Sequence, residues 1–208
     1  MSVAVKGGSN NESHNHNDVG SYMYVKGCHI LADELGAGLY TKDYFLSENR
    51  YEILNRGSHG HSLPIVNGCR QQCGVETMAD SFEKTENGVK LSFAAAYDPN
   101  ACLKNLTRFL SLDQSGVCIK DCFTFSKNSN SVTERIITKL DAVITGENTV
   151  SITKDGAAVG TVTFLTKGTV RIVQDEYASA GSGLQTVTII ELEGTTDTDT
   201  MELSYRIQ

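Results

Sequence analysis

Most of the chain alternates hydrophobic and polar residues in short runs that end at glycine-containing turns. Runs of this kind, rich in β-branched and aromatic residues, are typical of half-buried β-strands, because successive side chains point to opposite faces of a sheet. In the last two thirds of the chain they cover residues 74–78, 89–96, 103–110, 116–125, 131–140, 149–153, 158–166, 169–175, 185–192 and 201–207. The pattern predicts an all-β fold, a supersandwich-like antiparallel β-sandwich with less than about a tenth of its residues helical.

The first third reads differently. Residues 20–25 and 28–33 predict a hairpin that turns at Lys26-Gly27, and residues 41–55 predict an irregular or partly helical excursion. Asn87-Gly88 and Asp155-Gly156 are the two clearest hairpin turns further along. Neither a linker nor a shift in composition marks a boundary, so we predict one domain over residues 1–208.

Composition and net charge limit the kinds of binding partner that we expect for this chain. Hydrophobic residues make up 39% of the 208 residues and charged residues 21%, as in an ordinary folded protein. With 18 Lys and Arg against 25 Asp and Glu the net charge is −7, and no basic run could follow a phosphate backbone, so nucleic acid is not expected as a partner. No apolar run approaches the roughly 18 residues of a membrane span, so we expect no membrane partner. An acidic sugar could bind only at a locally basic or metal-bearing cleft.

Six cysteines include two Cys-x-x-x-Cys pairs, Cys69 with Cys73 and Cys118 with Cys122. A four-cysteine zinc site is one interpretation, but neither pair has the tight-turn context of such sites. We instead expect small, buried, apolar residues in a reducing compartment.

The richest chemistry lies in residues 12–20, which read Glu-Ser-His-Asn-His-Asn-Asp-Val-Gly. If this stretch enters a strand, His14 and His16 point to the same face, so that one could hold a metal while the other works on a substrate. Asp18 could orient an imidazole through its second ring nitrogen. The alternative is a polar, solvated loop.

His16, Asp33 and His61 come from three separated segments, as expected of a site built at one end of a sandwich. Two imidazoles and a carboxylate suit zinc, with a fourth position left for water or another ligand. The alternative is that the histidines are ordinary structural residues.

The sequence also resembles a known family. Residues 6–21, Leu31-Ala32-Asp33 with residues 36–40, Arg50-Tyr51-Glu52 and residues 61–68 are similar to the C-terminal half of the heparinase II/III-like polysaccharide lyases. The similarity is specific over residues 6–68 and looser over residues 97–125. It implies a two-part enzyme, in which an N-terminal α/α toroid and a C-terminal β-sandwich enclose the substrate.

The resemblance also implies roles. His16, Asp33 and His61 would hold a structural zinc ion, and His14 would face an acidic polysaccharide and take part in β-elimination at a uronic acid. The family's tyrosine acid/base lies in the helical toroid, which nothing in this chain matches, so the chain by itself is expected to be inactive. Tyr40, Arg50 and Tyr51 could contact the acidic sugar.

Two classes of function follow. The first is the zinc-binding β-sandwich of a lyase that cleaves a heparin-like or alginate-like polysaccharide. The second is a non-catalytic carbohydrate-binding or structural sandwich with a structural metal site. In either class, an alternative to contact with a sugar is that Tyr40 and Tyr51 are ordinary half-buried strand residues.

Overall fold

The computed structural model of the chain describes residues 1–46 and 49–208. Strands take up 55% of the residues and helices 8%, which confirms the all-β prediction. The predicted excursion over residues 41–55 is partly helical where it is described, and its residues 47–48 lie outside the described residues. No helix in the described part of the chain is long and apolar enough to cross a membrane.

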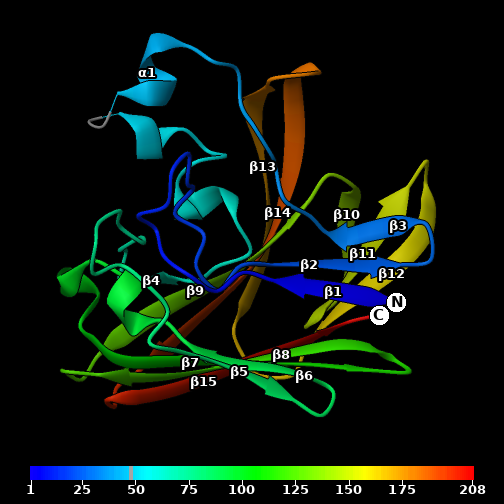
Figure 1. Cartoon of the computed structure of the whole chain (residues 1–208). Helices are drawn as coiled ribbons and strands as arrows, with labels where there is room; N and C mark the ends of the chain where they lie inside the picture. The colour runs from blue at the N-terminus through cyan, green and yellow to red at the C-terminus, as the bar shows by residue number, and fades with distance from the viewer. Residues whose placement is uncertain (47–48) are drawn as a thin grey trace.

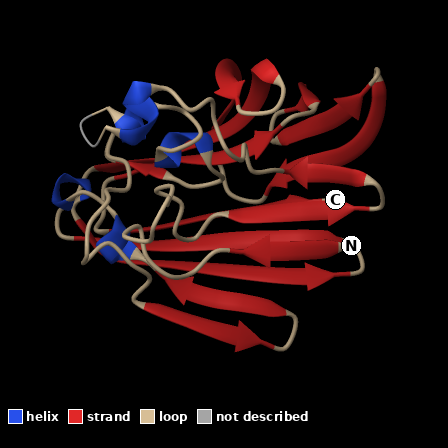
Figure 2. Ribbon diagram, turned by 45° about the horizontal axis from the view of Figure 1, so that its top comes forward, coloured by secondary structure: helices blue, strands red, loops and turns tan. Residues whose placement is uncertain are grey.

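The described residues form three antiparallel sheets (Figures 1 and 2). The strands are β1 (Ser2–Val5), β2 (Tyr22–Lys26), β3 (His29–Ala32), β4 (Ile65–Val66), β5 (Ser81–Thr85), β6 (Gly88–Ser92), β7 (Leu103–Asp113), β8 (Gly116–Phe125), β9 (Asn130–Thr138), β10 (Asp141–Gly146), β11 (Thr149–Lys154), β12 (Ala157–Phe164), β13 (Thr169–Ser179), β14 (Gly183–Thr196) and β15 (Thr200–Ile207). The helical pieces are short: α1 (Lys42–Phe45) and the 3-10 turns η1 (Arg50–Glu52), η2 (Ser58–Gly60), η3 (Ala94–Ala96) and η4 (Pro99–Ala101).

The largest sheet has eight strands in the order β10-β11-β12-β15-β8-β7-β6-β5. A four-stranded sheet, β13-β14-β9-β4, and a three-stranded sheet, β1-β2-β3, lie over it (Figure 1). One cluster of buried side chains joins all three sheets, with Tyr24 on β2, Ile190 on β14 and Ile119 on β8 among its members. The core therefore lies between the large sheet and the two smaller ones, as in a sandwich.

Both hairpins singled out in the sequence form, and one of the two predicted turns is placed correctly. β11 pairs with β12 across Asp155-Gly156, whereas β5 pairs with β6 with Thr85 opposite Gly88, so that turn consists of Glu86 and Asn87, one residue earlier than predicted. Asp155 and Gly156 have φ of 51° and 78°, the left-handed conformation that a two-residue hairpin turn requires. The hairpin over residues 20–33 is also confirmed, as β2 and β3.

The errors in strand assignment concern weakly patterned segments. Residues 74–78, predicted as a strand, form a turn that ends in an isolated bridge from Met78 to Ser9. β1, β5 and β10 were not predicted, and each is an edge strand of its sheet. An edge strand with little buried surface carries few hydrophobic residues in alternation, and residues 82–85 of β5 are all exposed.

The cysteines are all free thiols, but the expectation that they are buried is wrong. Cys28 and Cys73 are exposed and the other four are partly exposed. Cys118 and Cys122 lie four residues apart on β8, where the alternate side chains point into the core.

A buried charge cluster connects the large sheet to the four-stranded sheet. Arg108 on β7, Asp121 on β8 and Glu134 on β9 have side chains with no exposed surface. The Arg108 guanidinium donates to both carboxylate oxygens of Asp121, with Nε–Oδ1 and Nε–Oδ2 distances of 2.8 and 3.1 Å, and Nη2 lies 3.4 Å from Glu134 Oε2. A buried ion is tolerated only when its hydrogen-bonding capacity is met, so this cluster fixes the relative position of β7, β8 and β9.

Glu134 is the excess anion of this cluster. Burial and the neighbouring Asp121 carboxylate raise the pKa of Glu134 well above its ordinary value, although Arg108 acts in the opposite direction. The protonated form of the Glu134 carboxyl is therefore favoured in the folded protein compared with an exposed glutamate.

This protonation predicts a pH-dependent effect of Glu134→Gln. In the unfolded chain a Glu carboxyl has a pKa of about 4.3. Because the pKa of Glu134 is higher in the folded protein, its protonation stabilises the fold fully below about pH 4.3. This stabilisation is lost as the pH rises toward the folded pKa, by at most about 1.4 kcal/mol per pH unit. Glutamine does not titrate. From pH 5 to pH 8 the variant should therefore gain stability relative to the original chain.

Urea unfolding at the two pH values measures this difference. Glu147→Gln, which changes an exposed residue in the turn between β10 and β11, is the control and should show no such trend. A difference in free energy of unfolding between the Glu134→Gln chain and the original chain that stays constant from pH 5 to 8 would mean that Glu134 is ionised in the folded protein.

Candidate functional site

The long loop between β1 and β2 and the segment after η2 bring two histidines and a carboxylate together. His16, Asp18 and His61 each offer one ligand atom, and these atoms all lie within 4.8 Å of one another. The rings of His16 and His61 have centroids 5.4 Å apart. Two of the three residues predicted as metal ligands, His16 and His61, are thus adjacent in the structure.

Asp33, the third predicted ligand, is not in this group. Its carboxylate pairs with Lys139 at 3.2 Å and accepts a hydrogen bond from the backbone N–H of Glu34. Asp33 follows β3 directly, whereas Asp18 is on the same loop as His16. The structure therefore places Asp18, which the sequence suggested only as an orienting group, where Asp33 was expected.

The His-rich stretch is a loop and not the entry to a strand, so the same-face argument for its two histidines was wrong. His14 has φ of 60° and is exposed, whereas His16 is partly buried. The loop forms because its asparagine side chains replace the hydrogen bonds of a sheet. Asn10 Oδ1 accepts from the Asp18 N–H at 3.1 Å, and Asn17 Nδ2 donates to Gln71 O at 3.2 Å.

Asn15, between the two histidines, is the most highly connected of these residues. Its Nδ2 donates to Asn10 O at 2.6 Å and to His16 O at 3.2 Å. Arg50 Nη2 donates to Asn15 O at 2.9 Å, and the Tyr51 hydroxyl donates to Asn15 Oδ1 at 3.0 Å. Arg50 and Tyr51, predicted to contact a sugar, therefore both hold the loop that carries His14 and His16.

Tyr40, the third residue predicted to contact a sugar, lies elsewhere. It is 65% exposed, and its ring packs 5.2 Å from each of the rings of Tyr44 and Phe45 beside α1. The alternative that Tyr40 is a half-buried strand residue does not hold, because it is neither in a strand nor buried. An exposed ring in an aromatic cluster can still contact a sugar.

The two histidines differ in charge preference. Burial, followed by the nearby His61 and Arg56, lowers the pKa of His16 to about 4, so its imidazole is neutral at pH 7. Burial also disfavours the charged form of His61, but the Glu34 carboxylate, which contacts His61 Nδ1, outweighs burial and raises its pKa. The other ring nitrogen of His61, Nε2, is buried and has no hydrogen-bond partner in the protein.

These residues fit a zinc ion. Glu34 holds Nδ1 of His61 and leaves Nε2 as the free ligand atom, an arrangement in which a carboxylate orients a zinc-binding imidazole. His16 can supply a second nitrogen and Asp18 an oxygen, the ligand atoms of many zinc sites. An unpaired buried nitrogen costs free energy, and a metal ion would remove that cost. Lys6, which pairs with Asp18, would then compete with the metal for the carboxylate.

Both ligand-bearing segments are anchored by the buried charge cluster. Arg108 Nη1 donates to Gly20 O at 2.9 Å, two residues after Asp18, and to Ser62 O at 2.8 Å, one residue after His61. No local pattern predicts this anchor, because Arg108 lies far along the chain in an ordinary strand pattern. Nor does a local pattern distinguish Glu34 from its neighbour Asp33 as the partner of a histidine.

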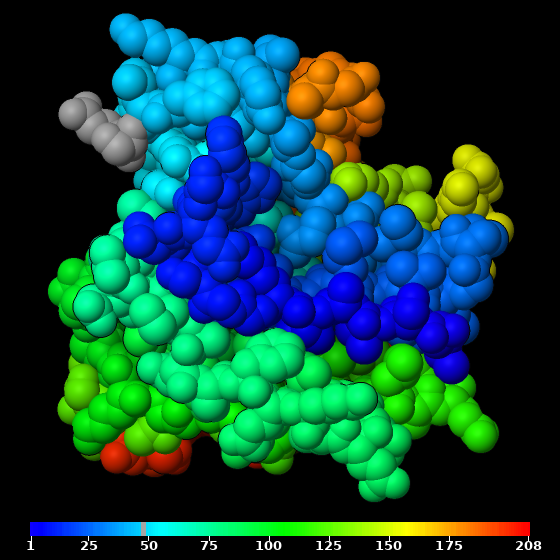
Figure 3. Space-filling view, in the orientation of Figure 1, coloured from blue at the N-terminus to red at the C-terminus, as the bar shows by residue number. Residues whose placement is uncertain are grey.

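On the surface, the His-rich loop is the dark-blue area between the cyan segment around α1 and the green segments below it (Figure 3). The loop is thus exposed along one side and packed along the other. His14 is exposed, whereas the partly buried ring of His16 lies beside that of His61.

Comparison with known proteins indicates the fold. No family model matches the chain, and no curated protein does. Among solved structures, a heparinase III aligns with 99% of this chain at a TM-score of 0.72 and 14% identity, and the heparan sulfate lyase HepC from Pedobacter heparinus aligns with 99% at 0.72 and 16%. A further heparinase III aligns with 94% at 0.64 and 12%.

These similarities define the fold class: the chain is an all-β sandwich of the kind found in heparinase-type lyases. The chain covers 31%, 32% and 30% of the three structures, so it spans about a third of their length. The expected resemblance to the β-sandwich of that family is thereby confirmed at the level of the fold.

Proposed function

We propose that this chain is the zinc-binding β-sandwich part of a polysaccharide lyase that cleaves a uronic-acid-containing polysaccharide by β-elimination. The observation that carries the proposal is the unpaired, buried Nε2 of His61 beside His16 and Asp18, at the base of the loop that exposes His14. The fold likeness to a heparinase III and a heparan sulfate lyase supports the reaction class.

The chemistry requires three operations on the sugar. The uronate carboxylate is neutralised, a base removes the C5 proton, and the C4–O bond breaks as the C4–C5 double bond forms while an acid protonates the departing oxygen. An exposed imidazole such as that of His14 is open to a substrate and belongs to the residue type most often used for proton transfer in catalysis. The resemblance assigns the remaining acid/base group to a helical part that this chain does not contain.

The metal has a supporting role in this proposal. Zinc bound at His16, Asp18 and His61 would tie the His-rich loop to the segment after η2. Asn15 is already held by Arg50 and Tyr51, so the backbone directly after His14 is fixed. A residue held in this way loses little conformational entropy when the substrate arrives.

The first prediction concerns the ligands of the metal. The purified chain should bind about one zinc ion and become more stable with zinc, by about 2.7 kcal/mol at a hundredfold excess over Kd. His16→Ala, His61→Ala and Asp18→Asn should each lose this binding, whereas Asp33→Asn should keep it. Metal analysis and thermal unfolding with and without zinc measure both effects.

His29→Ala is the matched control, because His29 lies on β3 outside the cluster. Circular dichroism checks that each variant is folded, and His16→Ala serves if the buried His61 cannot be replaced. Zinc lost in Asp33→Asn and kept in Asp18→Asn would reinstate Asp33 as the ligand. Stoichiometric zinc in both the His16→Ala and the His61→Ala variants would refute the assignment of the zinc site to these residues.

The second prediction separates His14 from the scaffold. Since His14 is exposed and outside the metal group, His14→Ala should leave zinc content unchanged and shift the free energy of unfolding by no more than about 0.5 kcal/mol. In an enzyme that joins this sandwich to its helical part, the same change should lower turnover by about 10²-fold or more. The measurement is the ultraviolet absorbance of the unsaturated uronate product.

The 208-residue chain alone should form no such product. Product formed by the chain alone would contradict a two-part mechanism. Undiminished turnover of the joined enzyme with His14→Ala would remove His14 from the mechanism.

A further inference from the structure

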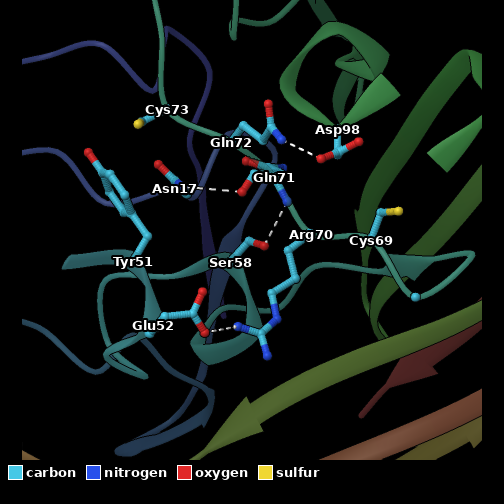
Figure 4. A pocket seen from close by; sticks show the side chains of 11 residues that line it. Asn17, Tyr51, Glu52, Ser58, Cys69, Arg70, Gln71, Gln72, Cys73 and Asp98 are labelled. Carbon is cyan, nitrogen blue, oxygen red and sulfur yellow. Dashed lines mark hydrogen bonds and ion pairs between the residues drawn. The ribbon is translucent and has the colours of Figure 1, made fainter. Parts of the chain in front are cut away.

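A second hollow lies on the other side of the His-rich loop. This pocket, of about 650 Å³, is lined by Asn17, Tyr51, Glu52, Arg70, Cys73 and Asp98 among others (Figure 4). His16 and Asp18 instead line a separate hollow beside β2. Asn17, between them in sequence, therefore points away from the metal cluster, and the loop presents a different face to each hollow.

Asn17 carries an unpaired acceptor into this pocket. Its side chain is only 1% exposed, and Nδ2 donates to Gln71 O at 3.2 Å. Its Oδ1 is buried without a hydrogen-bond partner in the protein. Figure 4 shows this oxygen directed away from Gln71, toward the side of the pocket where Tyr51 and Cys73 lie. A buried carbonyl oxygen without a partner is costly, so the site calls for a ligand that donates a hydrogen bond.

The charges of the pocket disfavour an anion. Arg70 is the cation among the lining residues, and its guanidinium is already paired with Glu52 at 3.1 Å. Asp98 is a second carboxylate, which accepts a hydrogen bond from Gln72 Nε2. A carboxylate or sulfate ligand would meet two negative groups and no free cation among the described lining residues.

The remaining groups suit a neutral sugar. Tyr51 contributes an aromatic ring, with the Arg50 guanidinium 5.2 Å from its centroid, and a hydroxyl that can still accept a hydrogen bond after donating to Asn15. Asn17 and Asp98 offer acceptors for sugar hydroxyl or acetamido N–H groups. Polar groups that converge in a pocket fix the orientation of a small ligand.

We propose that this pocket is a subsite for an uncharged sugar unit, whose O–H or N–H group donates to Asn17 Oδ1. The proposal rests on the proposed function for the polysaccharide as ligand, and it adds which unit the pocket selects. Asn15 connects the pocket wall at Tyr51 to His14, so a neutral unit in the pocket would place the neighbouring uronate along the exposed side of the loop.

NMR titration of the ¹⁵N-labelled chain tests the selection with two probes of similar size, N,N′-diacetylchitobiose and digalacturonate. The neutral disaccharide should shift the side-chain amide signals of Asn17 and Gln72 and should bind about tenfold or more tightly than the uronate. Equal affinities, or no binding of either probe, would overturn the proposal.

Two variants test whether the preference for the neutral probe arises in this pocket. Asn17→Leu removes the acceptor at similar volume and should weaken the neutral probe by about tenfold, as expected for one lost buried hydrogen bond. Glu52→Gln frees Arg70 and should tighten digalacturonate several-fold while leaving the neutral probe within about twofold. Glu202→Gln, an exposed glutamate paired with Lys120 on the large sheet, is the control and should change neither.

If Asn17→Leu does not fold, Glu52→Gln still tests the subsite. An unchanged preference for the neutral probe over digalacturonate in Glu52→Gln would contradict the proposal that the charges of the pocket exclude an anion. The titrations are repeated on the His16→Ala chain. Sugar binding that persists there without zinc would leave this subsite standing while the metal assignment is judged separately. Zinc binding without sugar binding in the original chain would refute the subsite alone.

Discussion

The candidate site depends on the complete pairing of one buried cation. Arg108 has no exposed surface, so each of its N–H groups needs a partner within the protein. Asp121 occupies one side of the guanidinium, and the carbonyl oxygens of Gly20 and Ser62 occupy Nη1. Because those carbonyls belong to the two segments that carry the candidate zinc ligands, the same ion that joins β7 to β8 also sets the distance between His16 and His61.

The loop built on this anchor has two functional faces. Asn10, Asn15 and Asn17 supply hydrogen bonds that a strand would take from its neighbours, and they free the loop from the alternation of a sheet. The loop can therefore direct His16 and Asp18 toward His61 and direct Asn17 into the neighbouring pocket. In our account the metal holds one face, the sugar binds the other, and His14 stands exposed beside them.

Much of the fold followed from local patterns, and much of the site did not. The β7 and β8 strands and the Asp155-Gly156 turn were predictable, because buried alternation and a left-handed turn are encoded within a few residues. The edge strands β1, β5 and β10 lacked that signal. Choosing between Asp18 and Asp33 required the path of the β1–β2 loop, which is set by distant partners such as Arg56 and Gln71. The role of Arg108 depends on contacts across many residues of sequence, which no local pattern records.

In our proposal, the His-rich loop and the segment after η2 present one metal site with Asp18 as its carboxylate. Anomalous diffraction at the zinc absorption edge, from crystals of the chain grown with zinc, tests this most directly. We predict one strong peak about 2.0–2.2 Å from His16, His61 Nε2 and Asp18. A peak bound by Asp33 in place of Asp18, or no peak between the two histidines, would contradict the account.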